Sequence, residues 1–332
     1  YNAMGAANGT ESRNVAIGSN ALAAMDNDAS NYNVAVGYDA GAAVTTGIQN
    51  TIVGAQAGDA LTTGSFNTVF GYEALTTEDA GANAINVAVG HQAGVAISTG
   101  VQNTLIGGNA GDALTTGTRN VAMGYLALSA EDTGNRNVAI GCDALLVANN
   151  GANNYNTAVG DSAGESVSTG TNNTIIGGLA GDALTTGSNN IIIGYLGAAS
   201  AVDVSNEITL GDANISAFRC ADQSIAALSD GRDKTDIKDS SYGLEFINTI
   251  RPVEFTWDFR PENMAEAKQG KKRVGFIAQE LQEAMPNSEN EILDLVYDIN
   301  DERIEAKYGN LIPILVKAVQ DLSEKVKALE NK

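Results

Sequence analysis

The sequence predicts a mainly β fold, in which a parallel β-roll or solenoid of 17 to 19-residue repeats precedes a small α+β domain that ends in a coiled coil. Three observations predict it: a motif that recurs along residues 1–200, a change of composition after residue 228, and a heptad pattern near the end of the chain. They divide the chain into a repeat region (1–200), a connector (201–228) and a carboxy-terminal domain (229–332).

The repeat is marked by the motif Asn-x-x-x-Gly. Neighbouring motifs start 17 residues apart, except at three gaps of 19 residues. An alanine stands seven residues after each asparagine, except in the last unit, where Gly197 takes its place. Such strict recurrence indicates one structural rung per unit. The motifs start at Asn14, Asn33, Asn50, Asn67, Asn86, Asn103, Asn120, Asn137, Asn156, Asn173 and Asn190.

Each unit contains a short run of apolar, often β-branched residues, such as Val15, Ala16 and Ile17. Three such residues between Asn and Gly favour a strand and are too few for a helix. Because the run is apolar on both faces, we expect one face to lie inside the coil and the other against a partner. The simplest partner is two further copies around a threefold axis, so the sequence predicts a homotrimer. The recurring Asn and Gly are expected to serve turns and stacked side-chain ladders.

The repeats are similar to the head repeats of trimeric autotransporter adhesins, which form trimeric left-handed β-rolls, and to stretches of phage tail fibres. The resemblance covers about 200 residues, although the unit is longer here than in the autotransporters. The resemblance implies that residues 1–200 form a shaft or head.

Composition excludes several function classes. The net charge of -21 and the pI near 4.2 argue against nucleic acid and anionic membrane as partners, because a polyanion would be repelled. No apolar run approaches 18 residues, so we expect no membrane insertion. Cys142 and Cys220 are far apart and His91 is the single histidine, so we expect no metal site and no cofactor.

Acidic residues in the repeats give no sign of an active site. The sequence GDALTTG occurs three times, and we interpret its aspartates, Asp59, Asp112 and Asp182, as solvated turn residues and not as calcium ligands. The 15 acidic residues of this region stand mostly one at a time, so no carboxylate couple for glycoside hydrolysis stands out. Aromatic platforms for sugar rings are not evident either.

The border at residue 228 carries a candidate catalytic pair. Ser229 stands five residues ahead of Lys234, and 16 of the 19 basic residues of the chain follow position 200. Strand-like patterns follow at 251–257 and 272–278, with a helix at 279–285. The connector before Ser229 has strand-like character but lacks the repeat period.

The chain ends in a predicted coiled-coil helix that starts at about residue 308. Six apolar residues are spaced 3, 4, 3, 4 and 3 residues apart, which is the pattern of an a/d seam. The helix should therefore self-associate, and three strands would match the symmetry expected for the roll. An amphipathic helix packed on its own domain is the alternative. The seam consists of Ile312, Leu315, Val319, Leu322, Val326 and Leu329.

Four ordered sequence blocks make the carboxy-terminal domain resemble a known family. They are Ser-Asp-x-Arg-x-Lys before Thr-Asp-Ile at 229–237, Arg-Pro-Val-Glu-Phe-Thr-Trp at 251–257, Val-Gly-Phe-Ile-Ala-Gln-Glu-Leu at 274–281, and Tyr-x-x-Leu-Ile-Pro-x-Leu-Val-x-Ala at 308–318. Together they resemble the intramolecular chaperone auto-processing domain of the peptidase S74 family. This domain occurs at the end of phage endosialidase tailspikes, phage fibres and the myelin regulatory factor.

The resemblance implies a domain that trimerises, helps the preceding β-structure to fold in register, and then cuts itself off. Carried over to this chain, it makes Ser229 the nucleophile, Lys234 the general base and Leu228-Ser229 the scissile bond. Asp230 and Arg232 match positions that orient the turn. Attack by the serine hydroxyl would produce an N-to-O acyl shift followed by hydrolysis of the ester.

These expectations favour a phage tail-fibre or tailspike tip that binds a host cell-surface glycan or protein. The resemblance implies location in the virion tail after folding in the host cytoplasm, with other tail proteins joined upstream. One alternative is part of a receptor-degrading tailspike carbohydrase whose catalytic domain lies upstream. Another is a surface adhesin without enzymatic activity.

Overall fold

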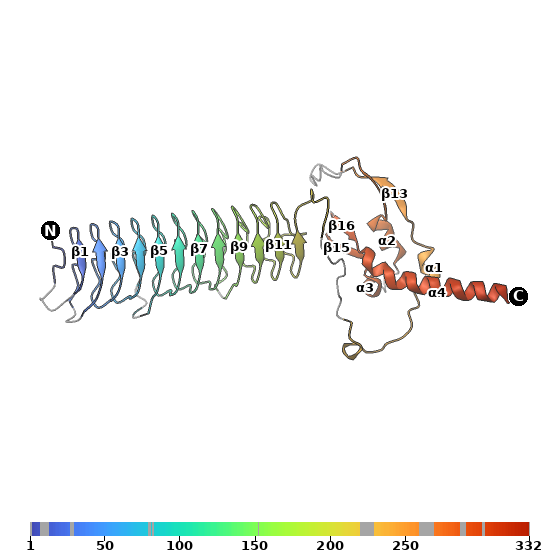
Figure 1. The fold of residues 1–332 in the computed structure, drawn as a ribbon, viewed down its shortest axis with the longest axis horizontal. Helices are drawn as coiled ribbons and strands as arrows, with labels where there is room; N and C mark the ends of the chain where they lie inside the picture. Colours follow the sequence, from blue (N-terminus) through green and yellow to red (C-terminus); the bar gives the residue numbers. More distant parts are fainter. Residues whose placement is uncertain are drawn as a thin grey trace. The chain divides into compact units, whose positions relative to one another are not determined.

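The computed structural model describes residues 2–6, 13–26, 30–78, 81, 83–151, 153–219, 229–258, 269–285, 290–300 and 303–331. The chain divides into two compact units, Tyr1–Asp212 and Ala213–Lys332, each of which is considered by itself (Figure 1). Among the described residues, no helix is long and apolar enough to cross a membrane.

The first unit is a parallel β-solenoid, as predicted. Its described residues include twelve three-residue strands that form one parallel sheet in chain order. Partners in neighbouring strands lie 17 or 19 residues apart, for example Val121 and Val138, so one turn of the chain makes one rung. The strands are β1 (Val15–Ile17), β2 (Val34–Val36), β3 (Thr51–Val53), β4 (Thr68–Phe70), β5 (Val87–Val89), β6 (Thr104–Ile106), β7 (Val121–Met123), β8 (Val138–Ile140), β9 (Thr157–Val159), β10 (Thr174–Ile176), β11 (Ile191–Ile193) and β12 (Ile208–Leu210).

Small aliphatic side chains form the interior of the solenoid. The middle residue of nearly every strand is buried, as Ala122 is in β7, whereas its two neighbours point to the outer face of the sheet. The recurring alanines are buried as well, and leucine, isoleucine or valine side chains such as Leu114 fill the space between them. Each rung therefore buries little by itself, and stability depends on the stacking of rungs.

The motif asparagines form a buried ladder along the solenoid. The backbone N–H of Asn120 donates to Oδ1 of Asn103 at 2.9 Å, and Asn120 Nδ2 donates to the carbonyl of Gly134 at 2.9 Å. The same backbone-to-side-chain bond recurs from Asn33 to Asn190. Most of these asparagines thus link two rungs and close their own turn, which satisfies polar groups that would otherwise be costly to bury.

The motif glycines allow the rungs to stack. Gly124 has a φ of +142°, and a Cβ on this residue would lie 2.2 Å from the carbonyl oxygen of Gly141 on the next rung. A side chain is excluded both by the backbone conformation and by this close approach.

The solenoid extends beyond the predicted boundary at residue 200. β12 pairs with β11 in register, with Ile191 opposite Ile208, so the 17-residue period continues into the segment assigned to the connector. Glu207 takes the ladder position, and its backbone N–H donates to Oδ1 of Asn190 at 3.0 Å. The prediction that this segment lacks the period was therefore wrong, because it relied on an asparagine that a glutamate replaces. Cys220 lies outside the described residues.

Glu131 is a buried carboxyl group in the wall of the solenoid. It stands 11 residues after Asn120, a position at which most units carry an apolar core residue. Its Oε1 accepts from the backbone N–H of Gly134 at 2.7 Å, and its Oε2 accepts from Asn154 Nδ2 at 2.6 Å. Burial raises the pKa of Glu131, since removal from water disfavours the charged form.

We predict that Glu131→Gln weakens the pH dependence of solenoid stability. Because the folded-state pKa of Glu131 is raised, the folded chain binds more protons than the unfolded chain from about pH 4.3 up to that pKa. The stabilisation is therefore complete at low pH and is lost as pH rises through this window. Oδ1 of Asn154 is buried and unpaired. If the side-chain amide of Asn154 flips, this oxygen can accept a hydrogen bond from the amide of a glutamine at position 131.

The measurement is thermal unfolding of both chains between pH 4 and pH 8. We expect the melting temperature of the unaltered chain to fall further than that of the variant, by about 2–4 °C. Glu165→Gln, at a half-buried turn position, serves as the control. A parallel pH dependence in all three chains would show that Glu131 is not the group responsible.

The second unit is a small α+β domain. Its described elements are η1 (Gly231–Asp233), α1 (Leu244–Ile247), β13 (Val253–Thr256), β14 (Lys272–Gly275), α2 (Ala278–Ala284), α3 (Asn290–Leu293), β15 (Val296–Asn300), β16 (Arg303–Ala306), η3 (Tyr308–Asn310) and α4 (Leu311–Glu330). β13 pairs with β14, and β15 with β16, as two antiparallel ribbons. The core contains Phe246, Met285, Leu293, Leu295, Leu311 and Ile314.

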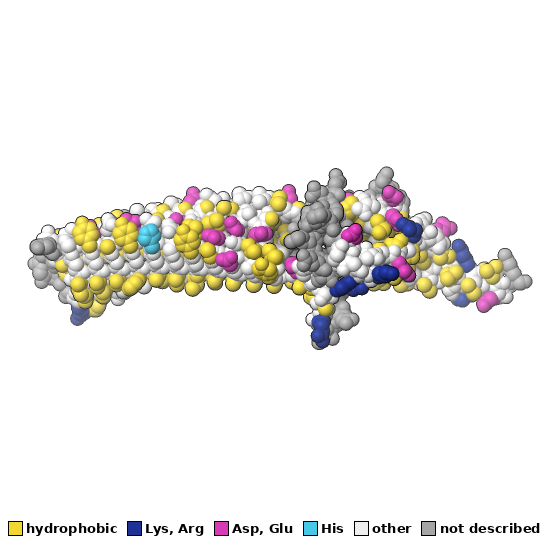
Figure 2. Space-filling view, turned by 90° about the horizontal axis from the view of Figure 1, so that it is seen from above, with side chains coloured by type: hydrophobic (Ala, Val, Ile, Leu, Met, Phe, Trp, Pro, Cys, Tyr) yellow, Lys and Arg dark blue, Asp and Glu magenta, His cyan; other side chains and the backbone are white. Residues whose placement is uncertain are grey.

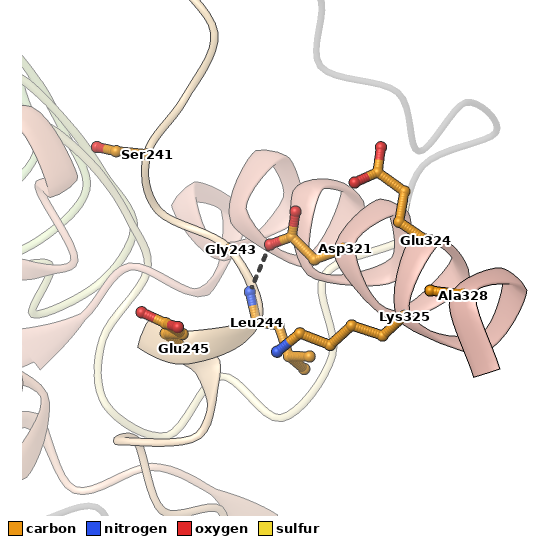
Figure 3. Close-up of a pocket in the computed structure, with 8 residues that line it drawn as sticks. All are labelled: Ser241, Gly243, Leu244, Glu245, Asp321, Glu324, Lys325 and Ala328. Carbon is orange, nitrogen blue, oxygen red and sulfur yellow. Dashed lines mark hydrogen bonds between the residues drawn. The ribbon is translucent and has the colours of Figure 1, made fainter. Parts of the chain in front are cut away.

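Short helix α1 is tied to long helix α4 by a side-chain cap. The backbone N–H of Leu244 donates to Asp321 Oδ2 at 3.1 Å (Figure 3). Lys317 forms an ion pair with the same carboxylate, and its hydrogen bond is the main cause that lowers the pKa of Asp321. A Cβ on Gly243 would lie 2.2 Å from Asp321 Oδ2, so glycine permits this approach. The contact holds the polypeptide that follows η1 against α4.

Candidate functional site

A single turn of 3-10 helix, η1, organises the candidate catalytic segment. Asp230 caps the turn and accepts a hydrogen bond from the backbone N–H of Arg232 at 2.9 Å. The guanidinium of Arg232 also pairs with the Asp230 carboxylate, with Nε 3.0 Å from both carboxylate oxygens. This pairing lowers the pKa of Asp230 and raises that of Arg232. Both residues therefore make hydrogen bonds that shape the turn.

The turn brings the predicted nucleophile and base together. Nζ of Lys234 donates a hydrogen bond to Oγ of Ser229 at 2.6 Å. Both side chains are exposed in the single chain. Leu228, which would supply the carbonyl of the scissile bond, lies outside the described residues.

The chemistry of this pair depends on the protonation of the amine. An ammonium group donates to the serine hydroxyl, whereas a general base must accept its proton. Lysines that act as bases are usually desolvated, because burial disfavours the charged form. The structure therefore places Lys234 Nζ in contact with Ser229 Oγ. Activation of the serine would require burial of Lys234, which is exposed in the single chain.

Helix α4 has two apolar faces. One face is buried in its own domain through Leu311, Ile314 and Ala318. The predicted seam residues are all exposed, between 44% and 69%, so packing within the domain does not account for them. An exposed apolar stripe of this length is typical of an association surface.

The outer face of the solenoid sheet is the second uncovered apolar surface. Residues that flank the buried centre of each strand point outward, among them Ile17, Phe70 and Ile208. Each of these three side chains is more than half exposed. Figure 2 shows a continuous line of apolar side chains along the lower edge of the solenoid. One side of the sheet is therefore apolar and uncovered in the single chain.

The structure also reveals an aromatic row that sequence reasoning missed. It consists of the aromatic residues that directly follow the motif glycine, namely Tyr38, Tyr72, His91, Tyr125 and Tyr195. All five are exposed. An alignment of the units on their motif asparagine would have placed these five residues in one column. Equivalent positions of stacked rungs lie side by side, so one column of the alignment is one row on the surface. Aromatic platforms were not expected from the sequence, whereas the structure shows five exposed rings at equivalent positions of the rungs.

The described residues that could bind a metal are spread along the chain. Among the described residues, no group of three or more His, Cys, Asp or Glu side chains could hold a metal ion. Asp59, Asp112 and Asp182 are half-buried turn residues, and Asp112 accepts hydrogen bonds from Asn109 and Ser129. The bond from Asn109 lies within the turn of Asp112, and the bond from Ser129 joins it to the next rung.

The two units define a β-solenoid protein with a carboxy-terminal α+β domain. Residues 229–288 of this domain match the family described as the chaperone of endosialidase, peptidase S74. The match begins at Ser229, the first residue of the candidate pair. The segment is therefore related to a self-cleaving peptidase. No curated protein and no solved structure matches the chain.

Proposed function

We propose that the chain is a homotrimeric tail-fibre-type protein whose carboxy-terminal domain acts as an intramolecular chaperone and then releases itself by cutting Leu228-Ser229. The observation that carries this proposal is the family match that starts at Ser229, together with the 2.6 Å contact between Ser229 Oγ and Lys234 Nζ. The exposed seam of α4 and the apolar sheet face support the trimer.

The repeats give a physical reason for a chaperone. Nearly identical rungs in three chains can pair one rung out of step at little local cost, so register is weakly specified. Assembly through long-range β contacts is also slow and prone to aggregation. A trimerising domain at one end sets the register and raises the local concentration of the chains.

Assembly would also switch on the cutting reaction. Burial of Lys234 in the trimer favours its neutral amine, which then accepts the proton of the Ser229 hydroxyl. Oγ attacks the carbonyl carbon of Leu228, the Ser229 amide nitrogen leaves with the proton returned by Lys234, and an ester joins the two residues. Water hydrolyses the ester, producing the carboxylate of Leu228 and restoring the serine hydroxyl. Cutting would thus report that folding is complete.

The mature product would serve in host attachment. A rod of stacked rungs suits a shaft or tip, and removal of the chaperone would leave a trimer that persists by kinetic stability. We assign it to the virion tail, after folding in the host cytoplasm. Its partners would be two further copies of itself, upstream tail proteins and a host surface molecule, with no nucleic acid or membrane insertion.

The chaperone proposal is tested by comparing Ser229→Ala in the complete chain with a chain of residues 1–228. We expect the complete variant to form a soluble trimer, because its trimerising domain stays attached. The shorter chain should give a roughly 10-fold lower yield of trimer, measured by light scattering after gel filtration. Equal yield and equal melting temperature of the two trimers would contradict the chaperone role.

A further inference from the structure

We propose that the aromatic row binds a neutral, linear glycan laid along the solenoid. This inference rests on the proposed attachment function and assigns the binding surface and the chemical class of the ligand. Each member of the row follows the carboxy-terminal end of a strand. The members are Tyr38 after β2, Tyr72 after β4, His91 after β5, Tyr125 after β7 and Tyr195 after β11.

The rings of the row are presented to solvent. Tyr38, Tyr125 and Tyr195 are between 55% and 66% exposed. Only 5% of the residues of the chain are Phe, Trp or Tyr, so these exposed rings are a notable share of them. Tyr72 and His91 stack on adjacent rungs, with ring centroids 5.6 Å apart and planes inclined by 21°. Figure 2 shows large hydrophobic side chains and the histidine in one line, apart from the apolar line at the lower edge. The row therefore differs from the sheet face that we assign to the trimer.

Small residues separate the rings. The position after the motif glycine is Ala55, Gly108 or Gly178 in three of the intervening rungs. A Cβ on Gly108 would lie 3.4 Å from Cδ2 of the Tyr125 ring, so the ring leans over this glycine. One such rung lies between Tyr38 and Tyr72 and one between His91 and Tyr125, which places the rings of each pair about 10 Å apart, close to the length of a disaccharide. The rungs that carry Tyr125 and Tyr195 are four apart.

Hydrogen-bonding side chains stand beside the rings. The next position in the chain carries Asp39, Glu73 and Gln92 after the first three aromatic residues. Nε2 of Gln92 donates to Glu73 Oε2 at 2.7 Å, which holds both groups at the surface. Sugars combine apolar C–H faces with hydroxyl groups, so aromatic platforms flanked by carboxylates and amides match their chemistry.

The charged side chains near the aromatic row favour a neutral glycan over an anionic one. The three basic residues of the repeat region, Arg13, Arg119 and Arg136, stand directly before a motif asparagine, at the opposite end of the strands. In the described part of the solenoid, the aromatic row therefore has carboxylates and no cationic side chain beside it. Sialylated or sulfated glycans would be repelled, whereas a neutral chain would not.

The test uses the complete chain with Ser229→Ala and an immobilised panel of neutral glucans, mannans and galactans beside sialylated and sulfated glycans. The row variant carries Tyr72→Ala, His91→Ala and Tyr125→Ala. We expect the background chain to bind a neutral polysaccharide, and the row variant to bind it on the order of 30-fold more weakly. A Tyr72→Phe, Tyr125→Phe chain should retain binding, since the rings remain.

A matched control removes three exposed aromatic residues from another position of the rungs. Tyr32, Phe66 and Tyr155 directly precede motif asparagines and are 37% to 50% exposed. Their replacement by alanine should change binding less than about 3-fold, with trimer content and melting temperature measured for every chain.

Two sets of outcomes separate this inference from the attachment proposal. Equal losses in the row variant and the control, preference for anionic glycans, or host-cell binding that persists in the row variant would overturn the glycan surface while leaving attachment intact. If the background chain bound neither glycans nor host cells, both the aromatic-row inference and the attachment proposal would fail.

Discussion

Ser229→Ala and Lys234→Ala chains are expected to remain intact, whereas the unaltered chain yields fragments of residues 1–228 and 229–332. The first variant lacks the attacking oxygen, which lies 2.6 Å from Lys234 Nζ. The second lacks the base, whose removal lowers a rate by roughly 10²–10⁴. Denaturing electrophoresis with mass spectrometry of the new amino terminus measures both effects.

Further variants distinguish a base from a positive charge. Lys234→Arg keeps the charge but holds its proton at all accessible pH values, so this chain should also stay intact. Lys238→Ala, which removes another exposed cation of the same segment, should be cut at the normal rate. Cutting in the serine variant, or a new amino terminus at another residue, would show that the Ser-Lys pair is not the catalyst.

The chain carrying Leu315→Asp and Leu322→Asp is expected to lose its trimer. Each leucine would contribute about 1.5–3 kcal/mol per chain when buried in the seam, and a buried, unpaired carboxylate adds a further penalty. Neither side chain is buried in the single domain, so its fold should survive. Gel filtration with light scattering measures the mass, and circular dichroism checks the helix.

The control places two aspartates at exposed positions of the helix that lie outside the seam. Gln320→Asp with Lys327→Asp changes two exposed residues outside the seam and should leave the trimer in place. The seam variant should also fail to cut itself, because Lys234 would remain in water. A seam variant that is still trimeric would refute the coiled coil, and a monomer that cuts normally would refute activation by assembly.

Local chemistry accounts for much of what could be predicted from the sequence. A strand such as Val121–Met123 follows from β-branched residues between Asn and Gly, and its register follows from the 17-residue spacing of identical units. The contact between Ser229 and Lys234 also depends on local structure, since Asp230 caps the turn that joins them. Short-range signals of this kind need no knowledge of distant contacts.

Other features depend on neighbours that are remote in sequence. Glu207 joins the asparagine ladder only because its rung stacks on that of Asn190. Glu131 is buried because its turn folds inward among apolar positions, although glutamate is usually exposed. The tyrosines of the aromatic row are scattered in the chain and form a surface only when rungs align.

The sequence by itself determined the repeat length, the strands and the carboxy-terminal helix, because periodicity and turn chemistry act over a few residues. Tertiary structure alone decided that the solenoid reaches Asp212, that the seam of α4 stays exposed and that five aromatic residues form a line. Stacking converts positions 17 or 19 residues apart into neighbours, and burial follows from those neighbours and not from residue type.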